Sequence, residues 1–185
     1  MKAGRQSPVQ FDAVVAKSTE RHGWPVVLEY ENEGQGPWLV DLSHHQRWDY
    51  QHGDVVSQSP FGLHVPALPG QVSIQRELLV SRMNGTQLAI WCLGQGEIET
   101  GHYDSGCTDM IDAHCMLAVT GADTPCVMEH LSKLDLFNPK REMPFLTQGP
   151  VMNIPCQVVT LGSNCVVMTL SRAYGQTFVD SALHA

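Results

Sequence analysis

The stretch that decides the fold is Ile111-Asp-Ala-His-Cys-Met-Leu-Ala-Val-Thr120, followed by Gly121-Ala-Asp-Thr-Pro125 and an apolar-patterned segment that runs to Leu134. Its first ten residues are β-prone and end at a glycine, which predicts a strand. Asp123 or Thr124 can cap a following helix, and Pro125 stands where a proline of the first helical turn is tolerated. The stretch therefore predicts a strand that leads directly into a helix.

The predicted helix has one apolar face and ends near Asp135. The residues on that face recur with helical spacing: Val127, Met128, Leu131 and Leu134. Asn138-Pro139 and Met143-Pro144 then interrupt regular structure. Val151 to Leu161 and Cys165 to Leu170 are predicted strands, joined by the hairpin loop Gly162-Ser-Asn164.

A last helix is expected from Tyr174 to His184, with apolar residues on one face. The order strand, helix, strand, strand, helix makes up most of a split β-α-β unit of the ferredoxin-like kind. We therefore predict an α+β fold with an antiparallel-rich sheet and helices on one face.

The N-terminal half gives weaker patterns. Residues 1–25 are expected to form an irregular arm with a short helix around Phe11 to Lys17, and residues 26–185 to form a single domain. Trp24 to Tyr30 and Trp38 to Leu42 are predicted strands, separated by a loop that glycine and proline interrupt.

The middle of the chain predicts a hairpin after a long loop. Residues 57–73 hold three prolines and two glycines, which is typical of a surface loop, and loops of this length often carry function. Arg47 to Val56 can continue the preceding strand after a bend. Glu77 to Arg82 and Thr86 to Leu93 are predicted strands, and Asn84-Gly85 between them is a hairpin signal.

Composition narrows the class of protein. The chain has 185 residues, with 11 basic and 19 acidic side chains and a net charge of −8, which argues against binding to a nucleic-acid backbone. An apolar fraction of 43% with 16% charged residues is typical of a globular domain. No apolar run is long enough for a membrane span, and the N-terminus lacks the apolar core of a secretory signal. The six cysteines form no C-x-x-C pair, so we expect them to be reduced and the protein to be cytoplasmic.

Four segments resemble the folate-binding aminomethyltransferase superfamily, which includes the glycine-cleavage T-protein. Trp38-Leu-Val-Asp-Leu-Ser-His-His-Gln-Arg-Trp48 is one of them, and the series that begins at Thr108 and continues through Gly121-Ala-Asp123 into the helix is another. Leu170-Ser-Arg-Ala-Tyr-Gly-Gln-Thr-Phe-Val-Asp-Ser-Ala-Leu183 and Gly62-Leu-His-Val-Pro-Ala-Leu-Pro-Gly70 resemble segments of the γ subunit of heterotetrameric sarcosine oxidase, a short relative of the T-protein. Together they span residues 38–185.

The resemblance implies an accessory γ-type subunit of an oxidative amine N-demethylase complex, of the sarcosine oxidase, methylglutamate dehydrogenase or dimethylamine monooxygenase type. Such a subunit has larger catalytic partners that carry flavin or haem, needs no redox cofactor of its own, and belongs to a system that can pass a one-carbon unit to tetrahydrofolate. A full T-protein is longer, and its N-x-x-G-G-x-x-D-D type segment, which holds the folate-binding acid, has no counterpart here. Two alternatives stay open: a stand-alone tetrahydrofolate-dependent one-carbon transferase, and a non-enzymatic α+β binding module.

Candidate ligand-binding residues are few. Arg172 and Tyr174 stand where the last helix begins, and a helix N-terminus suits an anion such as a carboxylate of folate. The alternative, which we favour, is that Arg172 pairs with an acidic neighbour across the sheet. His44 is the third candidate for folate or anion binding, although adjacent side chains in a strand point to opposite faces, so His44 and His45 are not expected to ligate one metal ion.

A partner interface is the other expectation. Trp38, His45, Arg47 and Trp48 are its candidates, because tryptophan and arginine are favoured interface residues, although the tryptophans could equally complete a small core.

No catalytic or metal site is predicted. His102, Cys107, His114 and Cys115 are the conceivable zinc ligands, but they lack the close pairing that zinc sites show. No G-x-S-x-G elbow, dinucleotide-binding glycine motif or P-loop is present.

Overall fold

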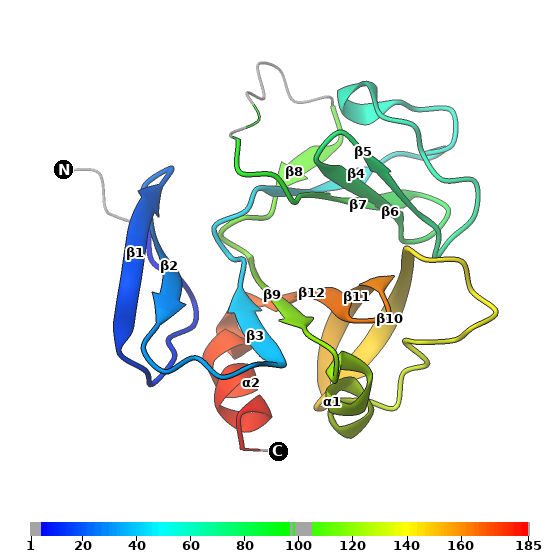
Figure 1. The fold of residues 1–185 in the computed structure, drawn as a ribbon. Coiled ribbons are helices and arrows are strands. Elements are labelled where there is room, and N and C mark those ends of the chain that lie inside the picture. Colours follow the sequence, from blue (N-terminus) through cyan, green and yellow to red (C-terminus); the bar gives the residue numbers. More distant parts are fainter. Residues whose placement is uncertain (1–4, 97, 99–104, 185) are drawn as a thin grey trace.

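A computed structural model describes residues 5–96, 98 and 105–184 of the chain. Its main body consists of two five-stranded sheets that lie face to face (Figure 1). The first, here called the helix-covered sheet, has the order β10-β11-β12-β9-β3, and all of its neighbouring strands are antiparallel. In that order its strands are Phe145–Val151, Ile154–Gly162, Cys165–Ser171, His114–Thr120 and Trp38–Asp41.

The second sheet, here called the loop-covered sheet, is also antiparallel throughout and has the order β5-β6-β7-β4-β8. In that order its strands are Val72–Gln75, Leu78–Arg82, Gln87–Cys92, Arg47–Gln51 and Cys107–Asp109. The predicted hairpin around Asn84-Gly85 is confirmed, because β6 and β7 are paired neighbours on either side of it.

Alternation along the strands divides the interior into layers. In β9, Cys115 and Leu117 pack in the cluster beneath the helices, whereas Met116 and Ala118 pack in the cluster between the two sheets. Strands buried on both faces read as continuous apolar runs, which is why the sequence around this strand is so clearly β-prone. The core of the described residues therefore has three large parts: one under the helices, one between the sheets and one under the long loop. A fourth, small cluster consists of Trp24, Val26 and Ile111.

Both regular helices cover the same face of the helix-covered sheet. They are α1 (Thr124–Leu131) and α2 (Gly175–Ala182), the latter preceded by the 3-10 turn η2 (Arg172–Tyr174). Met128 of α1 and Phe178 of α2 are buried in the cluster beneath them. The predicted α+β fold, rich in antiparallel sheet and with helices on one face, is confirmed. Helix α1 ends four residues before the expected Asp135, because Ser132 already adopts an extended conformation.

The long loop before β5 covers the outer face of the loop-covered sheet. It contains the 3-10 turn η1 (Pro60–Gly62), and its Leu63 and Val65 are buried against strands β4, β6 and β7. Part of this predicted surface loop is therefore core. The guanidinium of Arg82 fastens it by donating hydrogen bonds to the carbonyl oxygens of Pro66 and Ala67.

The N-terminal arm differs from the expectation. The helix predicted around Phe11 to Lys17 is wrong, because β1 (Val15–Arg21) pairs with β2 (Trp24–Tyr30) in an antiparallel hairpin that stands beside the main body in Figure 1. His22 and Gly23 both have positive φ, the geometry of a tight two-residue hairpin turn.

Two further elements depart from the sequence prediction. The strand expected from Val151 to Leu161 is the second arm of a hairpin, whose first arm, β10, was not predicted. Met152 and Asn153 form the turn with φ of 51° and 64°. Methionine is not a usual residue at such a position, so the sequence carries little signal for this turn. The strands of the main body also form two sheets, with the β1–β2 hairpin as a third, where the sequence suggested one.

No helix among the described residues is long and apolar enough to cross a membrane.

Candidate functional site

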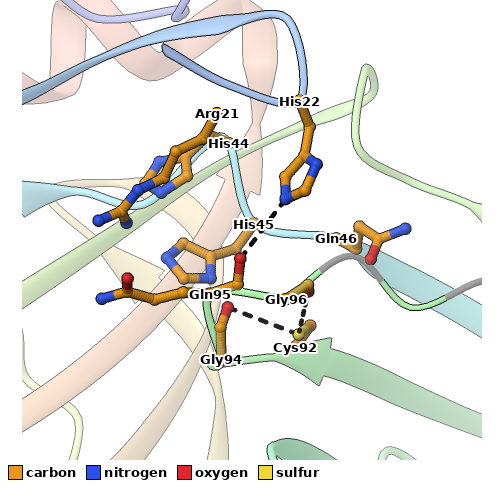
Figure 2. Close-up of a pocket in the computed structure, with 9 residues that line it drawn as sticks. All are labelled: Arg21, His22, His44, His45, Gln46, Cys92, Gly94, Gln95 and Gly96. Carbon is orange, nitrogen blue, oxygen red and sulfur yellow. Dashed lines mark hydrogen bonds between the residues drawn. The ribbon is translucent and has the colours of Figure 1, made fainter. Parts of the chain in front are cut away.

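His44 and His45 lie in the connection between β3 and β4, where three segments meet at a small pocket (Figure 2). Arg21 and His22 enter it from the β1–β2 turn, and Cys92 with Gly94 to Gly96 enters it from the end of β7. Figure 2 shows His22 reaching across the pocket, where its Nε2 lies 3.4 Å from the carbonyl oxygen of Gln95. The pocket has a volume of about 10 Å³, room for about one water molecule rather than for a cofactor.

The two adjacent histidines are held neutral by their surroundings. Their ring centroids lie 4.3 Å apart. Burial, together with the nearby side chains of His45, Arg21, His22 and Arg47, lowers the pKa of His44 to about 4, and burial is the largest cause. Burial also lowers the pKa of His45, while backbone hydrogen bonds with Cys92 and Gly94 oppose that shift. At neutral pH, His44 therefore adds no positive charge to this region.

The low pKa of His44 predicts that stability falls in mild acid. The unfolded chain takes up a proton at this residue near pH 6.5, but the folded chain takes it up only near pH 4. The contribution of neutral His44 to the free energy of unfolding is therefore fully present above about pH 6.5 and is lost as the pH falls toward 4. Because His44 keeps part of its surface in water, we expect a loss on the order of 1 kcal/mol from this residue. Urea unfolding between pH 4 and pH 7.5 measures it.

A matched pair of variants isolates this contribution. His44→Gln is expected to flatten the dependence of unfolding free energy on pH, because glutamine does not titrate. His64→Gln removes an exposed histidine outside the pocket and is expected to leave the wild-type slope in place. Equal slopes for His44→Gln and the wild type would contradict the assignment.

His44 also lines a much larger hollow. This hollow, here called the β2–β3 groove, has a volume of about 720 Å³, which is within the range of ligand-binding pockets. Its walls are β2 and the loop after it, strand β3, the segment before β1, and the end of the C-terminal helix at Leu183 and His184. In Figure 1, β2 and β3 stand on either side of this region.

The β2–β3 groove is apolar along its strands and acidic elsewhere. Val27, Leu28, Trp38 and Val40 line it and are each between 36% and 43% exposed. The acidic side chains on its lining are Asp12, Glu31, Glu33 and Asp41, and no lysine or arginine is present among the described lining residues. Burial raises the pKa of the Tyr30 hydroxyl, and the negative charges of Asp41 and Glu33 raise it further. The groove therefore suits an occupant that is apolar or positively charged.

The structure does not bring the three candidate folate- or anion-binding residues into one cavity. His44 lines the β2–β3 groove and the small pocket, whereas neither Arg172 nor Tyr174 lines either of them. Arg172 donates a hydrogen bond of 2.6 Å to the carbonyl oxygen of Gln6, and its guanidinium lies 5.9 Å from the ring centroid of Trp24. Tyr174 is 50% exposed on the surface of η2. Arg172 therefore ties the N-terminal segment to the start of the last helix.

The four candidate interface residues divide into two pairs. Trp38 and His45 lie at the β2–β3 groove and at the small pocket, respectively. Arg47 and Trp48 are buried inside the chain, with 1% and 2% exposure, so they offer no surface to a partner. Trp48 packs against Phe61 of the long loop, and the Arg47 guanidinium binds backbone carbonyl oxygens. Tryptophan and arginine patterns in a sequence do not distinguish an interface from a core.

The described residues contain no group of three or more histidine, cysteine or acidic side chains placed to hold a metal ion. His114 and Cys115 are neighbours on β9, where successive side chains point to opposite faces. Cys115 accepts a hydrogen bond from Ser43, and burial raises the pKa of its thiol to about 11. His102, the remaining histidine of the conceivable zinc set, lies outside the described residues.

Sequence reasoning did not find the β2–β3 groove. Its outer wall depends on the β1–β2 hairpin, and the signal for that hairpin was available in His22-Gly23, a pair that can adopt a two-residue turn. The polar composition of β1, which has no buried residue, hid the strand from a search for apolar periodicity.

A second open cavity of about 580 Å³ lies between the long loop and residues 141–145. The Arg141 guanidinium stacks 3.8 Å from the Phe145 ring centroid and donates hydrogen bonds to Thr147 and Leu146. The positive charge of Arg141 is therefore already bound by other groups of the same chain.

Comparison with known proteins bears on the fold. No family model matches the chain, and no curated protein sequence matches it. Among solved structures, the chain is similar to a chain of the heterotetrameric sarcosine oxidase from Corynebacterium sp. U-96 in complex with pyrrole 2-carboxylate. The TM-score is 0.59 and the sequence identity is 14%, and the match covers 79% of this chain and 79% of that chain. The chain therefore has a fold like that of a sarcosine oxidase subunit.

Proposed function

We propose that this chain is an accessory, non-catalytic subunit of a multi-subunit amine-oxidising complex of the sarcosine oxidase type, in the position of a γ subunit. The observation that carries the proposal is the structural match to one chain of a heterotetrameric sarcosine oxidase. Equal coverage of both chains means that the matched chain has about the length of this one. The likeness therefore spans most of a short chain and is not confined to a fragment of a long one.

In this proposal the redox chemistry belongs to larger subunits. They carry the flavin or haem, remove the N-methyl group of a secondary amine, and pass the one-carbon unit to tetrahydrofolate held elsewhere in the complex. The small chain contributes its surfaces to the assembly, which we place in the cytoplasm.

The charge of the β2–β3 groove argues against the stand-alone folate enzyme. The tail of tetrahydrofolate carries negatively charged carboxylates, and in this groove they would meet Asp41, Glu31 and Glu33 with no lysine or arginine among the described lining residues. Like charges at short range disfavour binding. Calorimetric titration of tetrahydrofolate into the isolated chain tests this alternative, and binding at micromolar concentration would support it.

Purification from the native host tests the proposed function. The full chain, carrying an affinity tag, is expected to elute with larger subunits that contain flavin or haem, and the eluate is expected to oxidise sarcosine or a related N-methyl amine. Mass spectrometry identifies the subunits, and dye reduction measures the activity. A chain that elutes alone as a monomer, from cells that oxidise such amines, would contradict the proposal.

A further inference from the structure

Strand β3 ends the helix-covered sheet, and no described strand pairs with its outer edge. Its other side is paired with β9 in the register Val40↔Ala118, and the N–H of Leu42 continues that register by donating to the Met116 carbonyl oxygen at 2.9 Å. Peptide groups of an antiparallel strand point alternately toward and away from the partner strand. The N–H and C=O groups of Leu39 and Asp41 therefore point away from β9, toward the free edge.

The β2–β3 groove runs along this edge. All four residues of β3 line it, and so do five consecutive residues of β2, Trp24 to Leu28. Successive side chains of a strand point to opposite faces of its sheet, so a hollow that touches consecutive residues follows the backbone edge and not one face. The groove thus has a strand edge on each side.

The β3 edge is the better template of the two. Pro25 lies within β2 and has no N–H to donate, and prolines in sheets are confined to positions that do not donate to the ladder. The exposed β3 side chains Trp38 and Val40 add apolar surface beside the unpaired backbone. Proteins usually protect such an edge, and an exposed apolar edge pairs readily with another chain.

We propose that the β2–β3 groove binds an extended segment of a larger partner subunit, which adds to β3 as a strand, packs alternate apolar side chains against Trp38 and Val40, and presents lysine or arginine to the acidic lining. In naming the partner, this inference rests on the proposed function. Charge complementarity selects the occupant. The lining carries Asp12, Glu31, Glu33 and Asp41, and like-charged segments would be rejected. Strand addition supplies affinity through backbone hydrogen bonds and specificity through alternate side chains.

The first test compares two lysine substitutions in the tagged full chain. Val40→Lys places a positive charge in the groove and is expected to lower the amount of co-purified partner subunit per chain at least tenfold. Ile74→Lys is the matched control, because Ile74 is an exposed apolar residue, 49% accessible, on β5 at the edge of the other sheet. It is expected to retain the wild-type ratio. Thermal unfolding of both variants checks that they fold, and equal retention of partner by Val40→Lys would overturn the proposal.

A second test needs no partner. A short amidated peptide in which valine alternates with lysine is titrated into the isotope-labelled chain and followed by NMR. The proposal expects shifts at the amides of Leu39 and Asp41 and slower hydrogen exchange there, and at least tenfold weaker binding for the same peptide with glutamate in place of lysine. Shifts that avoid β3, or that are equal for both peptides, would overturn it. So would a dimer of the chain that Val40→Lys dissociates, since a second copy would then be the occupant.

The two tests separate the two hypotheses. If no amine-oxidising subunit co-purifies but the lysine peptide binds at β3, the proposed function fails and the groove assignment stands. If the complex co-purifies equally with Val40→Lys and the peptide does not bind at β3, the function stands and the groove assignment fails.

Discussion

Arg47→Met is expected to lower the free energy of unfolding by about 3–5 kcal/mol, because it leaves several buried carbonyl oxygens without a donor. The guanidinium of Arg47 donates to the carbonyl oxygens of Ser43, His45, Ile111 and His114, the first three at 3.3, 2.8 and 2.9 Å. These four carbonyls belong to two connections: the one that carries His44 and the one that leads into β9. The side chain is 1% exposed, so water cannot replace it.

Urea unfolding at neutral pH measures this loss. Burial lowers the pKa of Arg47 to about 10, so the guanidinium remains charged in the folded chain at pH 7. Arg76→Met, at an exposed arginine of the β5–β6 turn, is the control and is expected to change stability by less than about 0.5 kcal/mol. A loss below about 1 kcal/mol for Arg47→Met would show that the four carbonyl oxygens find other donors.

Phe178→Ala is expected to cost a comparable amount, about 3–5 kcal/mol, through the loss of a fully buried aromatic ring. Phe178 is 0% exposed and belongs to the cluster between α2 and the helix-covered sheet. The helix lies very close to that sheet: a Cβ added at Gly175 would be 3.2 Å from the Cys115 Sγ and 3.1 Å from the Val9 Cγ1. This tight packing leaves little freedom for the helix to move into the cavity that the substitution creates.

Tyr174→Ala provides the matched aromatic control for Phe178→Ala. Tyr174 lies one turn earlier, is 50% exposed, and was a candidate for folate or anion binding from the sequence. Its removal is expected to cost less than about 1 kcal/mol. If thermal and urea unfolding showed equal losses for the two variants, the burial assigned to Phe178 would be wrong.

The elements that were predicted correctly are those for which two independent sequence features agreed. Strand β9 combined an apolar run with a terminal glycine, and the β6–β7 hairpin combined two such runs with Asn84-Gly85. The elements that were missed lacked one signal. Strand β1 has no buried residue, and the turn that ends β10 uses Met152 at a positive φ, where methionine is unusual.

The candidate site could be predicted only in part, because burial is not a local property. The Arg47-Trp48 pair reads as an interface anchor in the sequence, but β4 lies inside the loop-covered sheet, where the long loop covers Trp48 and two connections enclose Arg47. Trp38 lies ten positions before Trp48 and is also a tryptophan, but it is 39% exposed because β3 is an edge strand.

The sequence by itself determined the α+β class, the alternation that buries both faces of β9, and the negative charge. These follow from local periodicity and composition, which act within a few residues of chain. The tertiary structure alone decided that the strands of the main body divide between two sheets, that β3 keeps a free edge, and that the β1–β2 hairpin stands opposite it across an acidic groove. Those features depend on which strands pair at long range, and the free edge exists because no described strand of the chain pairs with the outer side of β3.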